Sequence, residues 1–238
     1  MASDDVMEWD DAYQESGQFQ GPPPWNIGEP QPELAALIKS GKIRGDVLDA
    51  GCGVAELSLA LAAEGHTVVG IDLTPTAVAA ATKAAEERGL TSATFVQGDI
   101  TSFTGYDGRF DTIVDSTLFH SLPVDGRDGY LHSAHRAAAP GAVFYILVFA
   151  NGAFPPGAEF GPNTVSEEEL RQAVSKYWTV DEIRPAFIHA NMSSAMPADA
   201  PFTLPPFEND DKGRQKMPAF LLTAHKGDAG AAQPATSG

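Results

Sequence analysis

The sequence predicts an α/β fold in which a mostly parallel, seven-stranded sheet carries helices on both faces. Short runs of apolar, β-branched residues alternate along the chain with alanine- and leucine-rich segments of helical length, an order typical of parallel sheets. The first predicted strand, 47–50, also runs directly into a turn at Gly51 and Gly53 that opens a helix. A strand, a glycine turn and a helix N-terminus together predict a ligand site.

The glycine turn suits a nucleotide or a nucleoside. Gly51 and Gly53 let the backbone turn tightly and approach a ligand with no Cβ in the way, while the first amides of the next helix point at that ligand. The dinucleotide fingerprint Gly-x-Gly-x-x-Gly requires a small residue where this chain has Glu56. The turn therefore departs from the nicotinamide-binding pattern at its last position.

Length and charge limit the possible functions. The 238 residues are enough for one domain with a sizeable core. The net charge of −17 disfavours a nucleic-acid partner, because binding DNA or RNA depends on clustered Lys and Arg. The longest apolar run, 142–150, is shorter than the ~20 residues of a membrane span. The acidic N-terminus lacks the features of a secretory signal, which predicts a cytoplasmic protein.

Cysteine usage argues against metal and disulfide chemistry. Cys52 is the single cysteine, so the chain can form no internal disulfide and offers no thiolate zinc site of the usual spacing. We expect no metal and no obligatory protein partner. A small-molecule substrate is the favoured kind of ligand.

The first 45 residues differ in composition from the rest of the chain. They are acidic, rich in proline around 21–32, and include several aromatic residues: Trp9, Tyr13, Phe19 and Trp25. Aromatic residues are depleted in disordered segments. We therefore interpret residues 1–45 as a lid over the ligand site rather than a disordered leader, with a helix at about 32–40 leading into the main domain.

The main domain is expected over residues 46–226, and 227–238 is expected to be a disordered tail of small residues. A first helix is predicted over 54–64, ending before Gly65. The strand at 67–71 ends on Asp72, where a carboxylate can accept both hydroxyls of a ribose. Thr74 and Pro75 predict the N-cap and first turn of the next helix.

The third and fourth strands are predicted at 94–97 and 110–115. The third ends in Gly98-Asp99-Ile100, so Asp49, Asp72 and Asp99 occupy three successive strand ends, where α/β sheets bind their ligands. A loop that contains His120 follows the fourth strand. We expect it to face a second small molecule that binds beside the first ligand.

A helix over 127–138 and a turn at Pro140-Gly141 lead to a buried strand at 143–149. Ser166 and Glu169 predict a capping box that opens the next helix.

The last two strands are predicted at 177–184 and 219–225. The residues between them, 185–218, are interpreted as a loop that supplies an apolar pocket wall with a few polar groups, among them His189 and Asn191.

These motifs resemble class I S-adenosylmethionine-dependent methyltransferases. The resemblance rests on Asp49-x-Gly51-x-Gly53, on Asp72 and on Gly98-Asp99, with Ala55 departing from the third glycine that many members carry. The order of elements, seven strands with five helices between the first six, is similar to the Rossmann-like fold of that family. More narrowly, 25–32, 115–123 and 165–169 resemble the thiopurine-methyltransferase-like group, and within it the heterocyclic toxin methyltransferases and benzoquinone-methyltransferase-like proteins.

The resemblance implies methyl transfer from S-adenosylmethionine, leaving S-adenosylhomocysteine, to an oxygen or nitrogen of a small aromatic or heterocyclic compound such as a phenol or hydroxyquinolone, a reaction that can detoxify it. The expected cofactor-binding residues are Trp25, Gln31, Asp49, Gly51, Gly53, Asp72, Leu73, Gly98, Asp99, Ile100 and Asp115. The expected substrate-binding residues are Phe119, His120, His189 and Asn191.

His120 is the predicted catalytic residue, because a neutral imidazole can accept a proton from, or hydrogen-bond to, the group to be methylated. The alternative is a histidine that only caps the loop or lines the pocket, since acidic acceptors can already be ionised.

Two functions from other classes remain open at this stage. A nicotinamide-dependent oxidoreductase would use the same strand-end Asp72 but requires a small residue at Glu56. A non-catalytic S-adenosylmethionine-binding module would hold the nucleoside without turnover.

Overall fold

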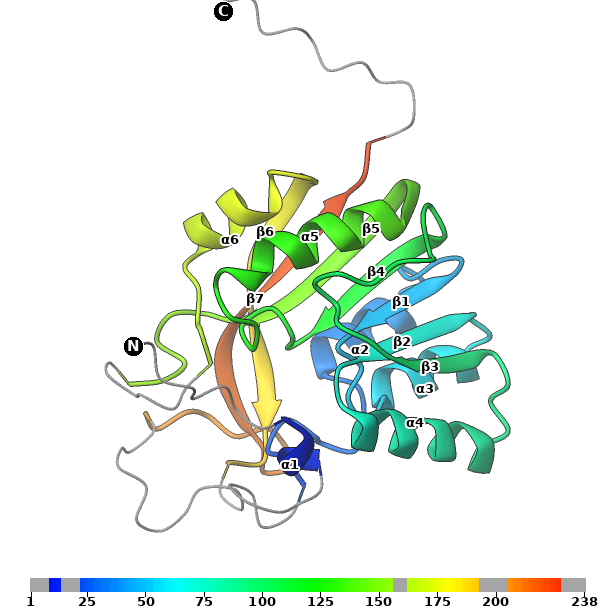
Figure 1. Cartoon of the computed structure of the whole chain (residues 1–238). Coiled ribbons are helices and arrows are strands. Elements are labelled where there is room, and N and C mark those ends of the chain that lie inside the picture. The colour runs from blue at the N-terminus through cyan, green and yellow to red at the C-terminus, as the bar shows by residue number, and fades with distance from the viewer. Residues whose placement is uncertain (1–8, 14–21, 156–161, 193–204, 228–238) are drawn as a thin grey trace, which may run out of the picture.

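The computed structural model describes residues 9–13, 22–155, 162–192 and 205–227. Its centre is a seven-stranded sheet in the order β3-β2-β1-β4-β5-β7-β6 (Figure 1). The strands are β1 Val47–Ala50, β2 Val68–Asp72, β3 Ala93–Gln97, β4 Phe110–Ser116, β5 Ala138–Phe149, β6 Thr179–Ala190 and β7 Gln215–His225. The pairs among β1 to β5 are parallel, and β7 runs antiparallel to both of its neighbours. The predicted α/β class and the mostly parallel sheet are confirmed.

Helices cover both faces of this sheet. They are α1 Trp9–Tyr13, α2 Pro32–Lys39, α3 Glu56–Ala63, α4 Pro75–Glu87, α5 Gly126–Ala137 and α6 Glu167–Val174. Leu34 of α2 and Leu57 and Leu61 of α3 pack on one side of the sheet, while Tyr130 of α5 and Leu170 of α6 pack on the other. In the view of Figure 1, α5 lies in front of the sheet, with α2 and α3 behind it.

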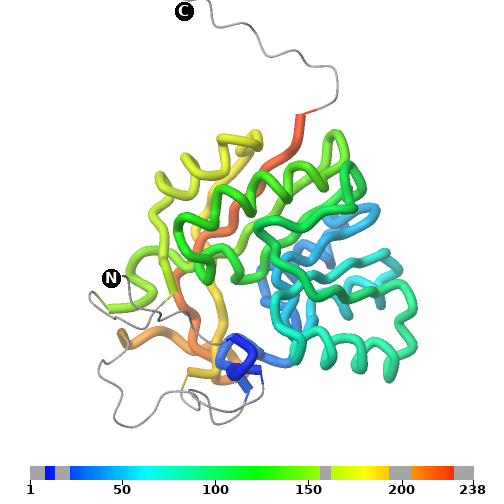
Figure 2. The backbone as a smooth tube through the Cα atoms, in the orientation of Figure 1, coloured from blue at the N-terminus to red at the C-terminus, as the bar shows by residue number. Residues whose placement is uncertain are grey.

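The order of strands in the sheet reverses between β1 and β4: β2 and β3 lie on one side of β1, and the strands from β4 onward lie on the other. β1 pairs with β2 on one side and with β4 on the other, so the connections that leave β1 and β4 diverge. Such a switch point opens a crevice outside the carboxyl ends of the strands. The backbone trace places α1 at this end of the sheet, beside the ends of β6 and β7 (Figure 2).

One predicted helix is missing. Residues 98–109, between β3 and β4, form turns, so the described residues have four helices rather than five between the first six strands. This connection is short and contains Gly105 and Gly108, both at positive φ, where a helix cannot continue. The expected turn at Pro140-Gly141 lies inside β5, at a register shift between Phe110/Ala138 and Thr112/Val143.

The last two strands are longer than predicted. β6 and β7 stay paired from Thr179/His225 to Ala190/Gln215, so 185–190 and 215–218 belong to strands rather than to a loop. Pro185 is tolerated because β6 is an edge strand. Its open side has no neighbouring strand, so a missing N–H on that side loses no hydrogen bond. His189 is therefore a strand residue. Residues 193–204 and the tail from 228 lie outside the described residues.

Two caps were predicted locally. Ser166 and Glu169 form the expected capping box at α6, with each side chain bonded to the other residue's backbone N–H. Thr74 is the N-cap residue of α4, but its side chain makes no capping bond there. Its hydroxyl instead donates to Asp72 Oδ1 at 2.9 Å, because that carboxylate ends the preceding strand.

Candidate active site

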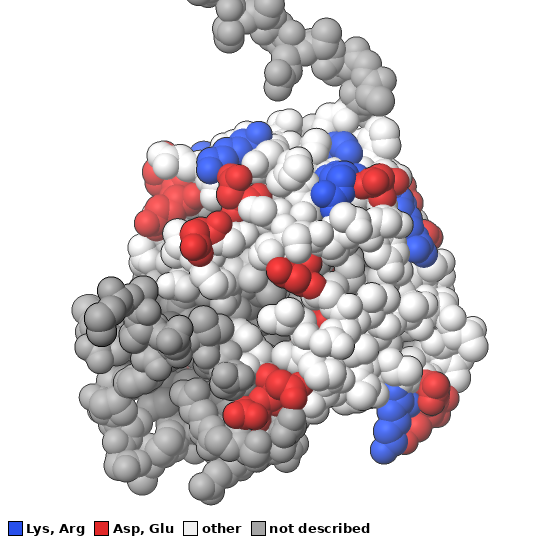
Figure 3. Space-filling view, in the orientation of Figure 1, with Lys and Arg blue, Asp and Glu red and all other residues white. Residues whose placement is uncertain are grey.

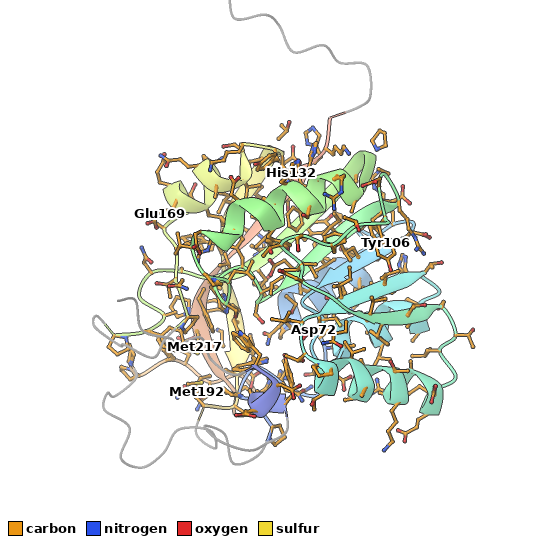
Figure 4. All side chains as sticks on the ribbon, in the orientation of Figure 1. Asp72, Tyr106, His132, Glu169, Met192 and Met217 are labelled. Carbon is orange, nitrogen blue, oxygen red and sulfur yellow. The ribbon has the colours of Figure 1, made fainter. Side chains whose placement is uncertain are left out.

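A cleft lies over the carboxyl ends of β1, β2 and β4. It consists of two adjoining cavities that share Tyr13, Trp25, Gly51, Ser116 and Thr117. The larger cavity has about 790 Å³ of space between its lining atoms, part of it open to solvent. It continues from Asp72, Leu73 and Asp99 to the loop after β4, and the other cavity lies over the glycine turn and Asp49. Figure 4 labels Asp72 at the end of β2, facing the side on which α1 lies.

The glycine turn has the geometry that the sequence predicted. Gly51 and Gly53 have φ of +67° and +53°, which favour glycine. A Cβ on Gly51 would lie 2.7 Å from Leu118 Cδ1, and one on Gly53 would lie 2.7 Å from the Tyr13 hydroxyl. Ala55 adopts the left-handed conformation with φ of 68°, at the position where relatives of the resembled family carry glycine. The turn thus has three left-handed residues at alternate positions, and two of them are glycines.

Glu56 occupies the position that excluded the dinucleotide fingerprint. It is the first residue of α3 and lies 3.3 Å from Arg88, at the end of α4. The side chain points to a partner on the neighbouring helix, so no small residue is needed here for helix and strand to pack.

Asp72 ties the turn to the second strand. Its Oδ2 accepts the Gly53 N–H at 2.8 Å, and its Oδ1 accepts the N–H and hydroxyl of Thr74 at 3.0 and 2.9 Å. A carboxylate offers about four acceptor positions. One acceptor position, on Oδ2, therefore remains for a ligand hydroxyl. The sequence had suggested that Asp72 accepts two ribose hydroxyls.

Asp49 is buried beneath the turn and lines the smaller cavity. Its Oδ2 accepts the Ser58 hydroxyl at 2.6 Å. Burial raises its pKa to about 6, against the lowering effect of Ser58, and the negative charge of Asp72 raises it further. A cationic ligand group above Asp49 would favour its ionised form.

Leu73, Asp99 and Ile100 line the far part of the larger cavity. Leu73 is 58% exposed, which is unusual for a large apolar side chain and leaves a flat apolar surface in the cleft. Asp99 Oδ1 accepts hydrogen bonds from the N–H and the hydroxyl of Thr101, at 2.8 and 2.7 Å. No bond to its Oδ2 is found in the described part of the chain, so this oxygen is available to a donor such as an exocyclic amine.

The N-terminal segment forms a wall of the cleft. Trp9, Tyr13 and Trp25 line the larger cavity, and the two indoles meet edge to face with centroids 5.9 Å apart. Asp10 accepts the N–H of Thr76 at 3.1 Å, which attaches α1 to the start of α4. Burial and the charge of Asp72 raise the pKa of Tyr13, so its phenol stays protonated.

Gln31 connects this segment to the far edge of the sheet. Its side-chain amide donates to the carbonyl of His189 at 3.0 Å and accepts the N–H of His189 at 2.8 Å. The side chain thus pairs with the open edge of β6 as another strand would. It also lines the smaller cavity, as does Trp25.

The loop after β4 is organised by Asp115. Its Oδ1 accepts the N–H groups of Leu118 and Phe119 at 2.8 and 3.3 Å, and its Oδ2 accepts the Tyr130 hydroxyl at 2.9 Å. Burial raises its pKa to about 7 in spite of these bonds. Asp115 is not among the residues that line the two cavities. Its bonds hold this loop, and its expected contact with the cofactor stays a prediction.

His120 lies where the sequence placed it, in the wall of the larger cavity. Its Nδ1 accepts the backbone N–H of Phe149 at 3.1 Å, and the two rings stack with centroids 4.5 Å apart. Burial, together with the charge of Arg127, lowers the pKa of His120 to about 3. The imidazole is therefore neutral.

Other predicted residues lie elsewhere. Phe119 is fully buried in the core against Tyr130. His189 pairs through Nδ1 with Asp210 at 2.7 Å, and the Asn191 N–H donates to Pro24. None of these lines either cavity, nor does Gly98, whose N–H pairs with Asp72. Phe119 lies away from the cavities because its side chain turns into the core, and His189 does so as a residue of β6, which is longer than expected. Their roles in binding stay predictions.

Several lining residues were not singled out from the sequence as site residues. They are Trp9, Tyr13, Thr74, Ser116, Thr117, Leu118, Ser121, Leu122 and Phe149. The aromatic pair Trp9 and Tyr13 carried a signal, as part of the predicted lid. Thr117 carried none, although its φ of 75° is rare for a β-branched residue.

The described residues contain no group of three or more His, Cys, Asp or Glu side chains that could hold a metal ion. None of their helices is long and apolar enough to cross a membrane.

Comparison with known proteins agrees with this geometry. The methyltransferase-domain family matches residues 47–141. The chain is 54% identical to a 2-heptyl-1-hydroxyquinolin-4(1H)-one methyltransferase of Mycobacteroides abscessus, over 88% of this chain and 91% of that one.

Solved structures show the same architecture. One, from work on the conversion of a disulfide bond into a thioacetal group during echinomycin biosynthesis, has a TM-score of 0.78 and 32% identity, covering 93% of this chain and 92% of that one. The fold is also that of a Burkholderia thailandensis 1,6-didemethyltoxoflavin-N1-methyltransferase with bound S-adenosylhomocysteine, with a TM-score of 0.58 and 22% identity, covering 83% and 77%. The nicotinamide alternative is thereby excluded, and the chain belongs to the class I S-adenosylmethionine-dependent methyltransferases.

Proposed function

We propose that this enzyme transfers a methyl group from S-adenosylmethionine to an oxygen or nitrogen of a small aromatic heterocycle or phenol, as a detoxifying reaction. The observation that carries the proposal is a single cleft, made of two adjoining cavities, that is lined by Asp49, Asp72 and Asp99 after three successive strands and also by His120, Leu122 and Phe149. The hydroxyquinolinone named for the Mycobacteroides relative is an acceptor of this class.

The residues at the strand ends fit S-adenosylmethionine. Asp49 lies below the smaller cavity, where its buried carboxylate would favour the cationic amino group of the methionine end. The free position on Asp72 Oδ2 would take a ribose hydroxyl. Leu73 and Ile100 would pack on adenine, and Asp99 Oδ2 would accept its amino group. The bare Cα of Gly51 allows the cofactor to approach the backbone closely.

When bound, the cofactor supplies an activated methyl on a sulfonium. The protein then has to orient the acceptor and exclude water, and proximity of this kind supplies a large part of a rate enhancement. Phe149 and Leu122 offer apolar contacts to a flat ring, and His120 offers a polar one.

We propose that residues 1–45 act as the lid of a domain that spans 46–226. Support comes from Trp9, Tyr13 and Trp25 in the cleft wall and from the attachment of Asp10 to α4. The visible face of the molecule is acidic over the first turns of α1 and α6 (Figure 3), which disfavours a nucleic-acid acceptor.

The test is incubation with methyl-labelled S-adenosylmethionine and a panel of phenols, 1-hydroxyquinolones and thiopurines, followed by mass spectrometry of the products. We expect a labelled methyl on an oxygen or nitrogen of the heterocyclic acceptors. Calorimetry with S-adenosylhomocysteine is the control for a competent cofactor site. Cofactor binding without any methylated product would instead support the non-catalytic binding module.

A further inference from the structure

The tautomer of His120 is set by the strand next to it. β4 ends at Ser116, which pairs with Leu147 of β5. Phe149 follows Leu147 along β5, beyond the last residue paired with β4, and its N–H donates to His120 Nδ1 at 3.1 Å. A backbone N–H can only donate, so Nδ1 must be the unprotonated nitrogen. The proton of the neutral ring is therefore on Nε2.

Several contacts hold the ring in this state. The His120 side chain is almost fully buried and stacks on the Phe149 ring. The carbonyl of His120 accepts the N–H of Asn163 at 2.8 Å, which ties the backbone at His120 to the segment before α6. Rotating the ring to free Nδ1 would leave the Phe149 N–H buried and unpaired, which is unfavourable.

Charges around His120 also oppose its protonation. Arg127 of α5 donates to the carbonyls of Phe119 and Asn163, at 3.1 and 2.6 Å, and lies over the Phe119 ring. Its charge, together with burial, lowers the pKa of His120. The carboxylates whose charges act on Arg127 are Glu169 and Asp115. Glu169 accepts the N–H of Ser166 at the start of α6, and Asp115 of β4 accepts the Tyr130 hydroxyl of α5.

Nε2 is the polar atom left for the acceptor. His120 lines the larger cavity, and no partner for Nε2 is found among the described residues. Resting on the proposed function, we infer that His120 is a hydrogen-bond donor to an acceptor that binds already ionised, and that it does not act as the base.

The chemistry balances without a proton acceptor on the protein. The anionic oxygen of the acceptor forms the bond to the methyl carbon while the C–S bond breaks, and that electron pair remains on sulfur. The anion and the sulfonium neutralise each other, and no proton is released. The substrate class is therefore an acidic hydroxyl compound, such as an N-hydroxy heteroaromatic or an electron-poor phenol, that is largely ionised near neutral pH.

The first test reads the tautomer directly and needs no acceptor. In protein labelled with ¹⁵N-histidine, the His120 signal is assigned by its loss in His120→Gln. We expect the Nε2–H tautomer with no titration from about pH 5 to pH 8, with and without S-adenosylhomocysteine. A signal that titrates in this window, or an Nδ1–H tautomer, would overturn the inference.

The second test compares acceptors whose hydroxyl pKa runs from about 6 to about 10. We expect the midpoint of the rise of kcat/KM with pH to follow the pKa of each acceptor. His120→Gln, which can donate but cannot take a proton, should keep the rate within about tenfold, whereas His120→Phe should lose about 10²-fold, as when one donor to an oxyanion is removed. His66→Gln is the matched control, because His66 lies outside the cleft.

Equal losses in His120→Gln and His120→Phe, largest for the least acidic acceptors, would show that His120 is a base. Calorimetry with S-adenosylhomocysteine confirms that each variant folds and binds cofactor. If wild-type protein methylates no acceptor, the proposed function fails, and the NMR result still decides the tautomer.

Discussion

The Gly53 N–H donates a 2.8 Å hydrogen bond to Asp72 Oδ2, which joins the turn after β1 to the end of β2. The bond holds the glycine turn open over the cleft at the switch point of the sheet. The same carboxylate is the one proposed to hold a ribose hydroxyl, so we expect it to support the cofactor both through the turn and by direct contact.

Asp72→Ala should weaken binding of both S-adenosylmethionine and S-adenosylhomocysteine. Loss of a charge-assisted hydrogen bond costs on the order of 1.5 to 3 kcal/mol, which corresponds to a roughly ten- to hundredfold loss in affinity. Isothermal titration calorimetry on the folded variant measures it. Glu87→Ala, on the exposed side of α4, is the control. Unchanged affinity in Asp72→Ala would remove the proposed ribose contact.

Gly51→Ala should lower both stability and cofactor affinity, whereas Gly41→Ala should lower stability alone. Both glycines have φ of +67°, so both variants bear the cost of a left-handed alanine, about 1 to 2 kcal/mol. A Cβ at Gly41 meets nothing within 4 Å, but at Gly51 it displaces Leu118 in the cleft wall. Urea unfolding and calorimetry separate the two effects. Equal stability and equal cofactor affinity in the two variants would show that the close contact between position 51 and Leu118 does not affect cofactor binding.

Asp115→Asn should flatten the pH dependence of the free energy of unfolding between about pH 4 and pH 7. Burial raises the pKa of Asp115 from its ordinary value of 3.8 to about 7, so the folded state binds this proton more tightly than the unfolded state. The contribution is full below pH 4 and is lost as pH rises through 7, with a slope of up to about 1.4 kcal/mol per pH unit. Asp49, with its pKa raised to about 6, acts in the same direction.

Chemical denaturation of Asp115→Asn and wild type at several pH values measures this slope. Glu87→Gln should retain the wild-type slope, because its carboxylate is exposed. A slope in Asp115→Asn as steep as that of the wild type would show that Asp115 is ionised in the folded protein throughout this range.

Deletion of residues 1–30 should leave a folded core with little activity. It removes Trp9, Tyr13 and Trp25 from the cleft wall, while α2 and the whole sheet remain. Activity and protection of bound cofactor from solvent are the measurements, with circular dichroism to confirm the fold. Turnover equal to that of the full chain would refute a functional lid.

A point variant tests the same segment with less disturbance. Tyr13→Phe removes the hydroxyl that faces Gly53 and should reduce cofactor affinity several-fold. Tyr177→Phe is its control, because the Tyr177 hydroxyl donates to Asp128 at the surface, away from the cleft. Identical cofactor affinities in the two variants would show that the Tyr13 hydroxyl does not contribute, which leaves the indole rings as the part of the lid that acts on the cofactor.

The sequence by itself determined the parts of the molecule that depend on local signals. Apolar runs, glycine positions and caps predicted the first four strands and the turn at Gly51 and Gly53. Because parallel strands present their carboxyl ends at one edge, Asp72 and Asp99 had to meet at that edge wherever the strands lay. Asp49 met them from beneath the turn.

Only the tertiary structure decided the features made by residues distant in the chain. β6 and β7 extend past Pro185 because pairing along an edge strand outweighs the local signal for a loop. Asp115 faces Tyr130 rather than the cleft because the loop after β4 requires an acceptor for its own N–H groups. The proton of His120 is placed by the N–H of Phe149, which lies beyond the end of β4. No local pattern encodes that contact, because it exists only once two parallel strands of unequal length are paired.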